Sequence, residues 1–549
     1  MLAGCTPWPE DVARRYRDLG YWQGITLTDM LARAIRRAPD KTALVHGGER
    51  IGYRALGETV DRLACGFIDA GIRPLDRVVV QLPNIPEFVY TYFALARIGA
   101  VPVTALRAHR HTEVGHFLRA SGSVAYVIPD AIKGFDYRAM AQELAPKAPA
   151  LRTVFVAGEP AGGQHSLSKL LATPVDAGTL ATVRPDPSEV TTMLLSGGTT
   201  SLSKLIPRTH DDYVLNARLC GAAGGFDETT VLMVILPLGP NYNLASPGML
   251  GAFYYGGTVV LAPSGEATDV FGLVERERVT TIAAVLPLIS GWLDSDAPIR
   301  FDLSSLEVIQ NGGARLAPEL RSRLRERFGC TPQEIYGTAE GLINMTRLDD
   351  PDDLLLESSG APVCADDEII VVDDDGREVA AGVSGELLTR GPYTIRGYYN
   401  APEKNREAFT EDGFYRMGDI VRRQGRHVFT EGRRKDLINR GGEKISCEEV
   451  ENLIYAHPKV KVVTLVAMPD PVFGEKACAF VVPRPGETLA FDELIAFLRQ
   501  QKIATFKLPE RLEVVTELPL SPVGKILKRE LREMITEKLA REARKRGAA

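Results

Sequence analysis

The sequence predicts an α/β fold with a large N-terminal domain of layered α/β subdomains, a β-rich subdomain and a small α+β C-terminal domain. Three observations predict this fold: the length of 549 residues, strand-like runs that alternate with helical patterns over the first two thirds, and a restart of the strand pattern after Asp436. At roughly 100–200 residues per domain, this length requires more than one domain. We therefore expect two domains, over residues 1–435 and 436–549.

The layered part is predicted from apolar, β-branched runs separated by amphipathic segments. The runs are Val78–Leu82, Val101–Leu106, Val124–Ile128, Val190–Leu195, Val231–Pro237 and Thr258–Leu261. Helical patterns occupy Phe88–Ile98 and Leu316–Phe328. Such alternation is typical of sheets that are covered by helices.

Shorter elements are predicted in the last third. Asp373-Asp374-Asp375-Gly376 separates the apolar run Glu368–Val372 from Gly385–Leu388, which predicts a hairpin, and similar short strands continue to Thr430. After Asp436, the C-terminal domain is expected to contain the strands Val460–Met468 and Ala477–Val482, a helix with Phe491, Leu494, Ile495 and Leu498 on one face, and a charged helix over Lys528–Arg546.

Composition excludes several classes of protein. The 65 Lys and Arg against 71 Asp and Glu give a net charge of −6, which does not favour binding to nucleic acid. Seven scattered cysteines without a C-x-x-C pair indicate a reducing compartment and no zinc site. Met1–Tyr16 carries charges where an export signal is apolar, and the apolar runs are shorter than the about 20 residues that cross a bilayer. We therefore expect a cytoplasmic protein without a membrane partner.

The sharpest motif is Leu-Ser-Gly-Gly-Thr-Thr-Ser-Leu-Ser-Lys, residues 195–204, directly after the predicted strand Val190–Leu195. Adjacent glycines let backbone N–H groups approach phosphate oxygens, hydroxyl groups add donors, and a lysine adds a point charge. No Gly-Lys-Ser/Thr closes the loop, so a P-loop NTPase is not indicated. This segment predicts a phosphate-binding loop; for the segment alone, a flexible surface loop is the alternative.

Further motifs follow in a fixed order. They are Tyr-Gly-Thr-Ala-Glu-Gly at 336–341, Tyr-Arg-Met-Gly-Asp at 415–419, Glu-Gly-Arg-Arg-Lys-Asp at 431–436 with Gly-Gly-Glu-Lys at 441–444, and Leu-Ser-Pro-Val-Gly-Lys at 520–525. Together with the phosphate loop they resemble the superfamily of acyl-adenylate-forming enzymes, over nearly the whole chain. Local segments are similar to the stand-alone 2,3-dihydroxybenzoate or salicylate AMP ligases of siderophore pathways: Thr-Pro-Trp-Pro at 6–9, Lys-Leu-Ile-Pro-Arg-Thr-His at 204–210, Asn241-Tyr242 before Ser246-Pro247-Gly248, and Glu-Gly-Leu-Ile-Asn at 340–344.

The resemblance implies roles for individual positions in binding ATP and Mg²⁺. Nucleotide-binding residues would be Ser196, Gly197, Gly198, Thr199, Thr200 and Lys204 at the phosphates, Gly313, Ala314, Tyr336, Gly337 and Thr338 around adenine, and Asp419 and Arg433 at the ribose. Catalytic residues would be Lys525, His210 and Glu340, with Glu340 also the Mg²⁺ ligand. The aromatic acid would meet Asn241, Tyr242, Ser246, Gln310, Gly312, Ile335 and Ile343, and Asn344 would add polarity beside Gln310.

The resemblance also implies two half-reactions. Lys525 would bridge the carboxylate and the α-phosphate, because two anions must approach one another before in-line attack. A hinge at Lys435 would then let the mobile small domain rotate and present a face with Gly441, Gly442 and Lys444 to the incoming thiol.

Three functions are compatible with these residues. The first is an aryl-acid AMP ligase that acylates the phosphopantetheine thiol of a separate carrier protein, and the second is an aryl-CoA ligase that uses free coenzyme A. The third is a weakened nucleotide-binding relative, because the family usually has glycine where this chain has Ser201 and commonly histidine where it has Pro240. Asn241 and Ser246 would suit a ring with two adjacent hydrogen-bonding groups, as in 2,3-dihydroxybenzoate.

Overall fold

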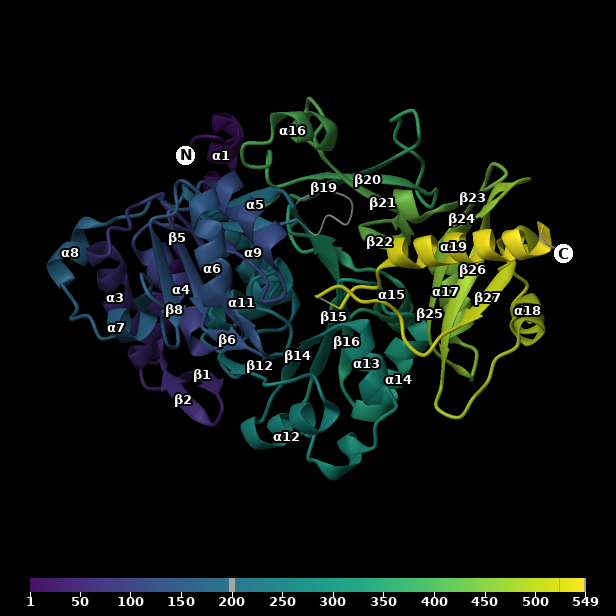
Figure 1. Ribbon diagram of the computed structural model, residues 1–549, viewed down its shortest axis with the longest axis horizontal. Coiled ribbons are helices and arrows are strands. Elements are labelled where there is room, and N and C mark those ends of the chain that lie inside the picture. The colour runs from purple at the N-terminus through teal and green to yellow at the C-terminus, as the bar shows by residue number, and fades with distance from the viewer. Residues whose placement is uncertain (197–202, 523, 548–549) are drawn as a thin grey trace.

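The computed structural model describes residues 1–196, 203–522 and 524–547. Layered sheets and helices make up the N-terminal part, a separate antiparallel sheet follows, and a smaller sheet with helices closes the chain (Figure 1). The predicted α/β class is thereby confirmed.

The first sheet runs in the order β11-β10-β4-β3-β5-β8-β9. Its strands pair in parallel, except that β11 returns antiparallel to β10. The bounds are β3 Arg77–Val80, β4 Val101–Thr104, β5 Ala125–Pro129, β8 Thr153–Ala157, β9 His165–Ser166, β10 Val190–Leu195 and β11 Leu205–Thr209, with β6 Ala131–Ile132 and β7 Phe135–Asp136 forming a separate small hairpin.

The second sheet runs in the order β18-β17-β16-β15-β14-β12-β13-β1-β2. The pairs from β16 to β1 are parallel, and both edges are antiparallel. The bounds are β1 Thr42–His46, β2 Glu49–Gly52, β12 Val231–Val234, β13 Thr258–Leu261, β14 Thr281–Ala284, β15 Val308–Gly312, β16 Thr331–Thr338, β17 Gly341–Met345 and β18 Ala361–Pro362.

Helices fill the space between the two sheets and cover their outer faces. The alternation along β3 shows why: Val78 and Val80 pack into the core between the sheets, and Val79 packs into the core on the outer side. The inner helices are α2 Leu27–Arg37, α3 Tyr53–Asp69, α4 Pro86–Arg97, α9 His210–Ala223 and α11 Gly248–Tyr255. Outer helices are α5 His111–Ser121 and α6 Tyr137–Leu144 on the first sheet, and α12 Ala267–Glu277, α13 Leu286–Leu293 and α14 Pro318–Phe328 on the second.

The remaining helices of the N-terminal part are short. They are α1 Glu10–Asp18, α7 Leu167–Leu171, α8 Ala177–Thr182, α10 Asn241–Ala245, α15 Asp352–Glu357 and α16 Pro402–Ala408.

The third sheet is antiparallel, in the order β19-β20-β21-β22, and it confirms the predicted β-rich subdomain. Its strands are β19 Glu368–Val372, β20 Gly385–Arg390, β21 Tyr415–Gln424 and β22 His427–Arg433. The predicted pairing of β19 with β20 is confirmed, and the turn at residues 373–376 first closes onto a bridge between Val372 and Glu378 before the chain continues to β20.

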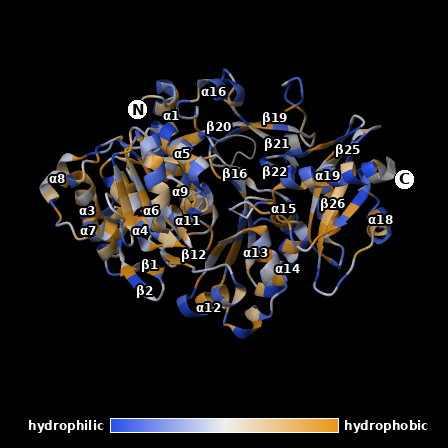
Figure 2. Cartoon of the chain, in the orientation of Figure 1, coloured by the Kyte–Doolittle hydropathy of each residue, from blue (hydrophilic) through white to orange (hydrophobic). Residues whose placement is uncertain are grey.

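The C-terminal sheet runs in the order β24-β23-β26-β25, with β27 beside β26, and β26 is mainly hydrophobic (Figure 2). The elements are β23 Ile438–Arg440, β24 Glu443–Ile445, α17 Cys447–Tyr455, β25 Val460–Asp470, β26 Gly474–Pro483, α18 Phe491–Gln500, β27 Arg511–Val514 and α19 Lys528–Gly547. On α18, Leu494 and Leu498 are buried as predicted, but Phe491 is 38% exposed because it begins the helix at the edge of the buried face.

The predicted division after Lys435 falls in the short 3-10 turn Arg434–Asp436, between β22 and β23, and stays a prediction. In this conformation one apolar cluster joins Leu324 and Phe328 of α14 to Val450 and Ile454 of α17. None of the described helices is both long and apolar enough to span a membrane.

Candidate active site

Lys525 lies in a narrow hairpin of the C-terminal part that reaches toward β15 (Figure 1). Its side chain lies against Gly313, where an added Cβ would be 3.3 Å from Lys525 Cε. Gly524 comes equally close to the N-terminal part, since an added Cβ would be 2.9 Å from Val285 Cγ2. Both glycines have φ near +80°, which other residues adopt only with strain. Glycine at both positions therefore lets the lysine enter the site.

Three charged side chains influence Lys525, those of Arg433, Asp419 and Glu340. Desolvation of the ammonium and the positive charge of Arg433 lower the pKa of Lys525, and the carboxylates of Asp419 and Glu340 oppose this shift. The residue as a whole remains exposed, so the site around it is open to solvent. Predicted catalytic and nucleotide-binding residues from two sheets and the C-terminal hairpin thus share one electrostatic environment.

Asp419 lies on β21 beside Arg433 of β22, in direct register. Arg433 Nε is 3.1 Å from Asp419 Oδ1, and the Tyr336 hydroxyl donates a 2.8 Å hydrogen bond to Asp419 Oδ2. Burial raises the pKa of Asp419, while Arg433 and Tyr336 oppose the shift. Tyr336, Asp419 and Arg433 form one cluster, and their adenine and ribose roles stay predictions.

Glu340 occupies the turn between β16 and β17 and is 7% exposed. The Tyr398 hydroxyl donates to Glu340 Oε1 at 2.9 Å. The Lys204 ammonium lies 4.2 Å from the centre of the same Tyr398 ring. Burial lowers the pKa of Lys204, and Glu340 opposes that shift. One tyrosine therefore holds both the predicted Mg²⁺ ligand and the predicted phosphate-loop lysine.

The predicted phosphate loop connects the antiparallel strands β10 and β11. Its ends are closed by two hydrogen bonds, from Ser196 N to Lys204 O at 3.0 Å and from Lys204 N to Ser196 Oγ at 2.9 Å. Gly197, Gly198, Thr199, Thr200 and Ser201 lie outside the described residues, so their phosphate-binding role stays a prediction.

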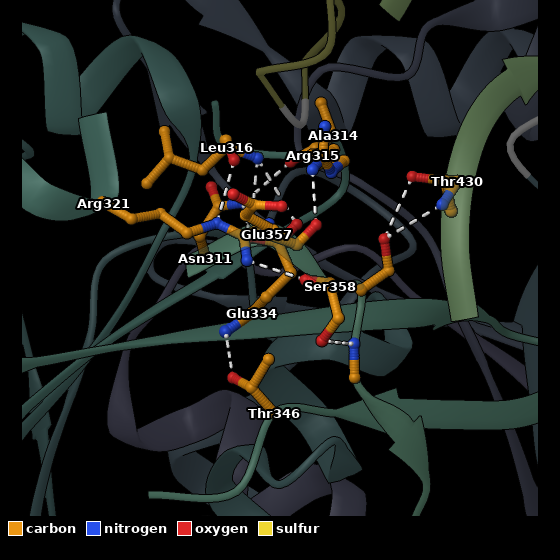
Figure 3. Close-up of polar contacts among 12 residues, drawn as sticks. Asn311, Ala314, Arg315, Leu316, Arg321, Glu334, Thr346, Glu357, Ser358 and Thr430 are labelled. Atoms are coloured by element: carbon orange, nitrogen blue, oxygen red, sulfur yellow. Dashed lines mark hydrogen bonds and ion pairs between the residues drawn. The ribbon is translucent and has the colours of Figure 1, made fainter. Parts of the chain in front are cut away.

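The predicted adenine loop, Gly312-Gly313-Ala314, follows β15 and is held from below by a buried ion pair (Figure 3). Arg321 Nη2 is 3.1 Å from Glu334 Oε2, and the two side chains are 1% and 2% exposed. Glu334 accepts a 3.0 Å hydrogen bond from Asn311, and Arg321 donates a 2.9 Å bond to Leu316 O. Burial lowers the pKa of Arg321 to about 10 and raises that of Glu334. The pair thus fixes both ends of the loop that faces Lys525.

Gly337 and Thr338 end strand β16 beside this loop. An added Cβ at Gly337 would lie 2.3 Å from Leu342 O, so only glycine fits there. The Thr338 hydroxyl is buried without a hydrogen-bond partner in the protein. A buried hydroxyl of this kind is available to a ligand.

His210 begins α9 and is 1% exposed. The backbone N–H of Leu27 donates to His210 Nδ1 at 3.1 Å, and burial lowers the pKa of His210 to about 3. The ring is therefore neutral at pH 7 with its proton on Nε2, so it can donate a hydrogen bond but supplies no positive charge. Its place beside the acid and the phosphates stays a prediction.

The predicted aryl-acid residues of the second sheet share one face. The register pairs Gln310 with Gln333, Gly312 with Ile335, and Gly337 with Ile343. An added Cβ at Gly312 would lie 2.9 Å from Tyr242 Cζ, so the tyrosine ring packs directly on this face. The prediction that Asn344 joins the same wall is wrong: it pairs with Tyr336, so its side chain lies on the opposite face.

Asn241 and Ser246 lie at the two ends of α10 and contact each other. Asn241 Nδ2 donates to Ser246 Oγ at 3.0 Å, the Tyr213 hydroxyl donates to Asn241 Oδ1 at 2.9 Å, and Asn216 Nδ2 donates to Ser246 Oγ at 3.2 Å. Pro240 is the N-cap residue of this helix. The two predicted polar groups therefore belong to a larger buried network.

The residues predicted to face the thiol lie away from Lys525 in this conformation. Gly441 and Gly442 form the turn between β23 and β24, and Lys444 Nζ is 2.7 Å from Asp374 Oδ2 of the third sheet. Lys435 lies in the preceding 3-10 turn, and its role as a hinge stays a prediction.

Comparison with known families identifies the family to which the chain belongs. Residues 31–399 match the AMP-binding enzyme family, and residues 449–525 match the AMP-binding enzyme C-terminal domain. The chain belongs to the AMP-binding enzyme family. It is an adenylate-forming ligase, and the resemblance inferred from its ordered motifs is confirmed.

Full-length relatives of this AMP-binding enzyme are known. The chain is 49% identical to a 2,3-dihydroxybenzoate-AMP ligase of Bacillus subtilis, over 98% of this chain and 99% of the relative. It is 46% identical to a salicylyl-CoA synthase / salicylate adenylyltransferase of a Streptomyces species, over 97% and 98% of the two chains. Among solved structures, Mycobacterium smegmatis MbtA superposes with a TM-score of 0.74 at 40% identity, covering 97% of this chain and 99% of that one.

Sequence reasoning missed several residues of this AMP-binding enzyme that hold the site in place. They are Tyr213, Asn216, Arg321, Glu334 and Tyr398. Glu334 lies in β16 Thr331–Thr338, which is largely polar in sequence, so its charge did not mark it as buried. The others act through residues far away in the sequence, so no local pattern marks them.

Proposed function

We propose that this AMP-binding enzyme is an ATP-dependent aryl-acid AMP ligase. It joins a hydroxylated aromatic carboxylate, of the 2,3-dihydroxybenzoate type, to AMP and releases pyrophosphate. It then transfers the aryl group to the phosphopantetheine thiol of a separate carrier protein. The observation that carries the proposal is the position of Lys525, packed on Gly313 and in the field of Asp419 and Glu340.

ATP and Mg²⁺ fit the residues that are present. The unpartnered Thr338 hydroxyl offers a donor for a nucleotide, next to the loop in which Gly313 lies against Lys525. Within the described residues no group of three or more His, Cys, Asp and Glu side chains could hold a metal by itself. A Mg²⁺ ion at Glu340 would therefore take its other ligands from phosphate oxygens and water, as this ion commonly does. When bound, it would neutralise phosphate charge.

The protein's own residues then have distinct tasks. Lys525 brings a positive charge between the carboxylate and the α-phosphate, where negative charge concentrates during in-line attack. Asp419, oriented by Tyr336 and Arg433, offers oxygens to the ribose hydroxyls. Neutral His210 keeps one N–H donor without adding charge. Lys204 supplies a cation at the end of the phosphate loop.

The acid is proposed from the residues at its side of the site. Asn241 and Ser246 can pair with ring substituents, while Ile335 and Ile343 are apolar and buried. A site built to pair with hydroxyl groups penalises analogues that lack them, at about 1–3 kcal/mol for each polar atom left unsatisfied. Relatives with the same length whose names specify 2,3-dihydroxybenzoate or salicylate support this choice.

A pyrophosphate-exchange panel tests the acid. We expect 2,3-dihydroxybenzoate to be activated well, salicylate less and benzoate poorly, and Ser246→Ala to narrow the gap between the first two. The panel also includes anthranilate, hydroxypicolinate and a long-chain fatty acid. If benzoate or the fatty acid were the best substrate, the proposed roles of Asn241 and Ser246 would be wrong.

The thiol acceptor is the second question, because one relative's name includes a CoA product. In the assay, the enzyme first forms aryl-AMP and is then mixed with either a phosphopantetheinylated aryl carrier protein or free coenzyme A. We expect faster thioester formation with the carrier protein. A higher kcat/KM for coenzyme A would establish the aryl-CoA ligase alternative instead.

A further inference from the structure

We propose that Tyr213 is a specificity-determining positioning residue, which orients Asn241 so that the wall at Asn241 and Ser246 presents hydrogen-bond donors. Such a wall selects 2-hydroxyaryl acids over 2-aminoaryl acids. This inference rests on the proposed function, since it assumes that the acid's ring lies against these two residues.

The phenol of Tyr213 fixes the Asn241 amide. Tyr213 is fully buried on α9, and its hydroxyl donates to Asn241 Oδ1 at 2.9 Å. The Arg208 guanidinium, 4.7 Å from the centre of the Tyr213 ring, is a cation and offers no acceptor. With the amide turned over, Asn241 Nδ2 would face the phenol oxygen, and the buried phenol proton would lose this acceptor. Leaving it unpaired is costly, so the orientation with Nδ2 toward Ser246 is preferred.

Asn216 fixes the Ser246 hydroxyl from the other side. Asn216 Nδ2 donates to the backbone oxygen of Ala245 at 2.6 Å, which only an N–H group can do, and the same nitrogen lies 3.2 Å from Ser246 Oγ. Ser246 Oγ therefore accepts from both Asn216 and Asn241. Its own proton remains to be donated, and Cys220 is its neighbour. A thiol sulfur is a weak acceptor, so a ligand oxygen would take this proton in preference.

The network therefore leaves two hydrogen atoms for a ligand, the Ser246 hydroxyl proton and the second N–H of Asn241. Both are donors, and the acceptor atoms of Asn241 and Ser246 already have partners. The buried acceptors without a partner, Asn216 Oδ1 and Gln310 Oε1, belong to neighbouring residues. Of the two ortho substituents, only a hydroxyl group complements these two donors. An ortho hydroxyl donates its single proton to the adjacent carboxylate and presents lone pairs outward. An ortho amino group also gives one proton to the carboxylate, but its second N–H points outward and meets a donor.

The test compares salicylate with anthranilate, which differ only in this group. We expect wild-type kcat/KM in adenylate formation to favour salicylate by about 100-fold, because a donor that faces another donor costs about as much as one buried polar atom left without a partner. Tyr213→Phe frees the Asn241 amide to turn over, so the ratio should fall below about 10-fold, mainly by a loss with salicylate. Tyr53→Phe is the matched control, because it removes another buried phenol, one that donates to Gly257 O, and should leave the ratio unchanged.

A second variant keeps the inference testable if Tyr213→Phe folds poorly. Asn241→Asp replaces the donor by an acceptor, so the ratio should shift toward anthranilate even if both rates fall. An unchanged ratio in a folded Tyr213→Phe or Asn241→Asp would overturn the role of Tyr213 while the ligase activity stands. Failure of the wild type to adenylate any aryl acid would instead overturn the proposed function.

Discussion

Replacing Arg321 by methionine should destabilise the protein and loosen the loop that faces Lys525. The arginine is 1% exposed and is the cationic partner of Glu334, which is 2% exposed. It also donates to the backbone oxygens of Leu316 at 2.9 Å, Leu355 at 3.2 Å and Ser358 at 2.7 Å. The substitution leaves a buried carboxyl group without its cation and three carbonyl groups without this donor.

The expected loss of unfolding free energy follows from the burial of the ion pair. Removing one partner of a buried ion pair costs about 3–5 kcal/mol, because the remaining charge stays in a medium of low dielectric constant. The double variant with Glu334→Gln removes that charge but not the unpaired carbonyl groups, so about 1–3 kcal/mol of the loss should remain. The difference between the single and double variants measures the cost of the isolated carboxylate.

The pKa of Glu334 determines how the destabilisation by Arg321→Met depends on pH. Burial already raises the pKa of Glu334 above its ordinary 4.5, and Arg321 is the largest influence that opposes this rise. In Arg321→Met the folded-state pKa rises further, so the folded state holds its proton more tightly than the unfolded state. The added destabilisation is absent below about pH 4.5 and grows as the pH rises toward the folded-state pKa.

Thermal unfolding of the wild type and both variants at pH 5 and pH 8 measures this effect. The Arg321→Met midpoint should fall more at pH 8 than at pH 5, and the double variant should lose that pH dependence. The KM for ATP should rise in the single variant, because the loop that carries Gly313 loses its support. Equal destabilisation at both pH values, or no recovery in the double variant, would refute the buried-pair argument.

Three other substitutions test the catalytic arrangement. Lys525→Ala should abolish adenylate formation in pyrophosphate exchange and leave ATP binding by calorimetry nearly intact, whereas wild-type exchange would remove the lysine from the mechanism. Lys435→Pro should spare adenylate formation and slow thioester formation in single-turnover assays, whereas equal losses in both steps would exclude the hinge. Tyr398→Phe removes the hydrogen bond to Glu340 but keeps the ring beside Lys204. Pyrophosphate exchange by this variant should therefore need a higher Mg²⁺ concentration. An unchanged Mg²⁺ dependence would show that Tyr398 does not position Glu340.

The order of elements was predictable because it depends on local patterns. Buried strands appear as mainly apolar, β-branched runs, and β10, β12 and β13 begin where such runs begin. Glycine-rich motifs were also visible, since a backbone that needs φ > 0 or close approach selects glycine, as at Gly313 and Gly524. The sequence by itself therefore determined the α/β class, the adenylating motifs and their order.

The tertiary structure alone decided which side chains meet and in which charge state. The register of β16 with β17 pairs Asn344 with Tyr336 and Ile343 with Gly337, and the order of residues alone does not reveal this pairing. Burial makes His210 neutral, although its sequence position suggested only that it lies near the phosphates. Tyr398 and Glu340, 58 residues apart, share a hydrogen bond only because the connection between β20 and α16 packs against the turn between β16 and β17. Local sequence patterns fix backbone conformation, whereas contacts, protonation and hydrogen-bond direction depend on packing between segments that are distant in the chain.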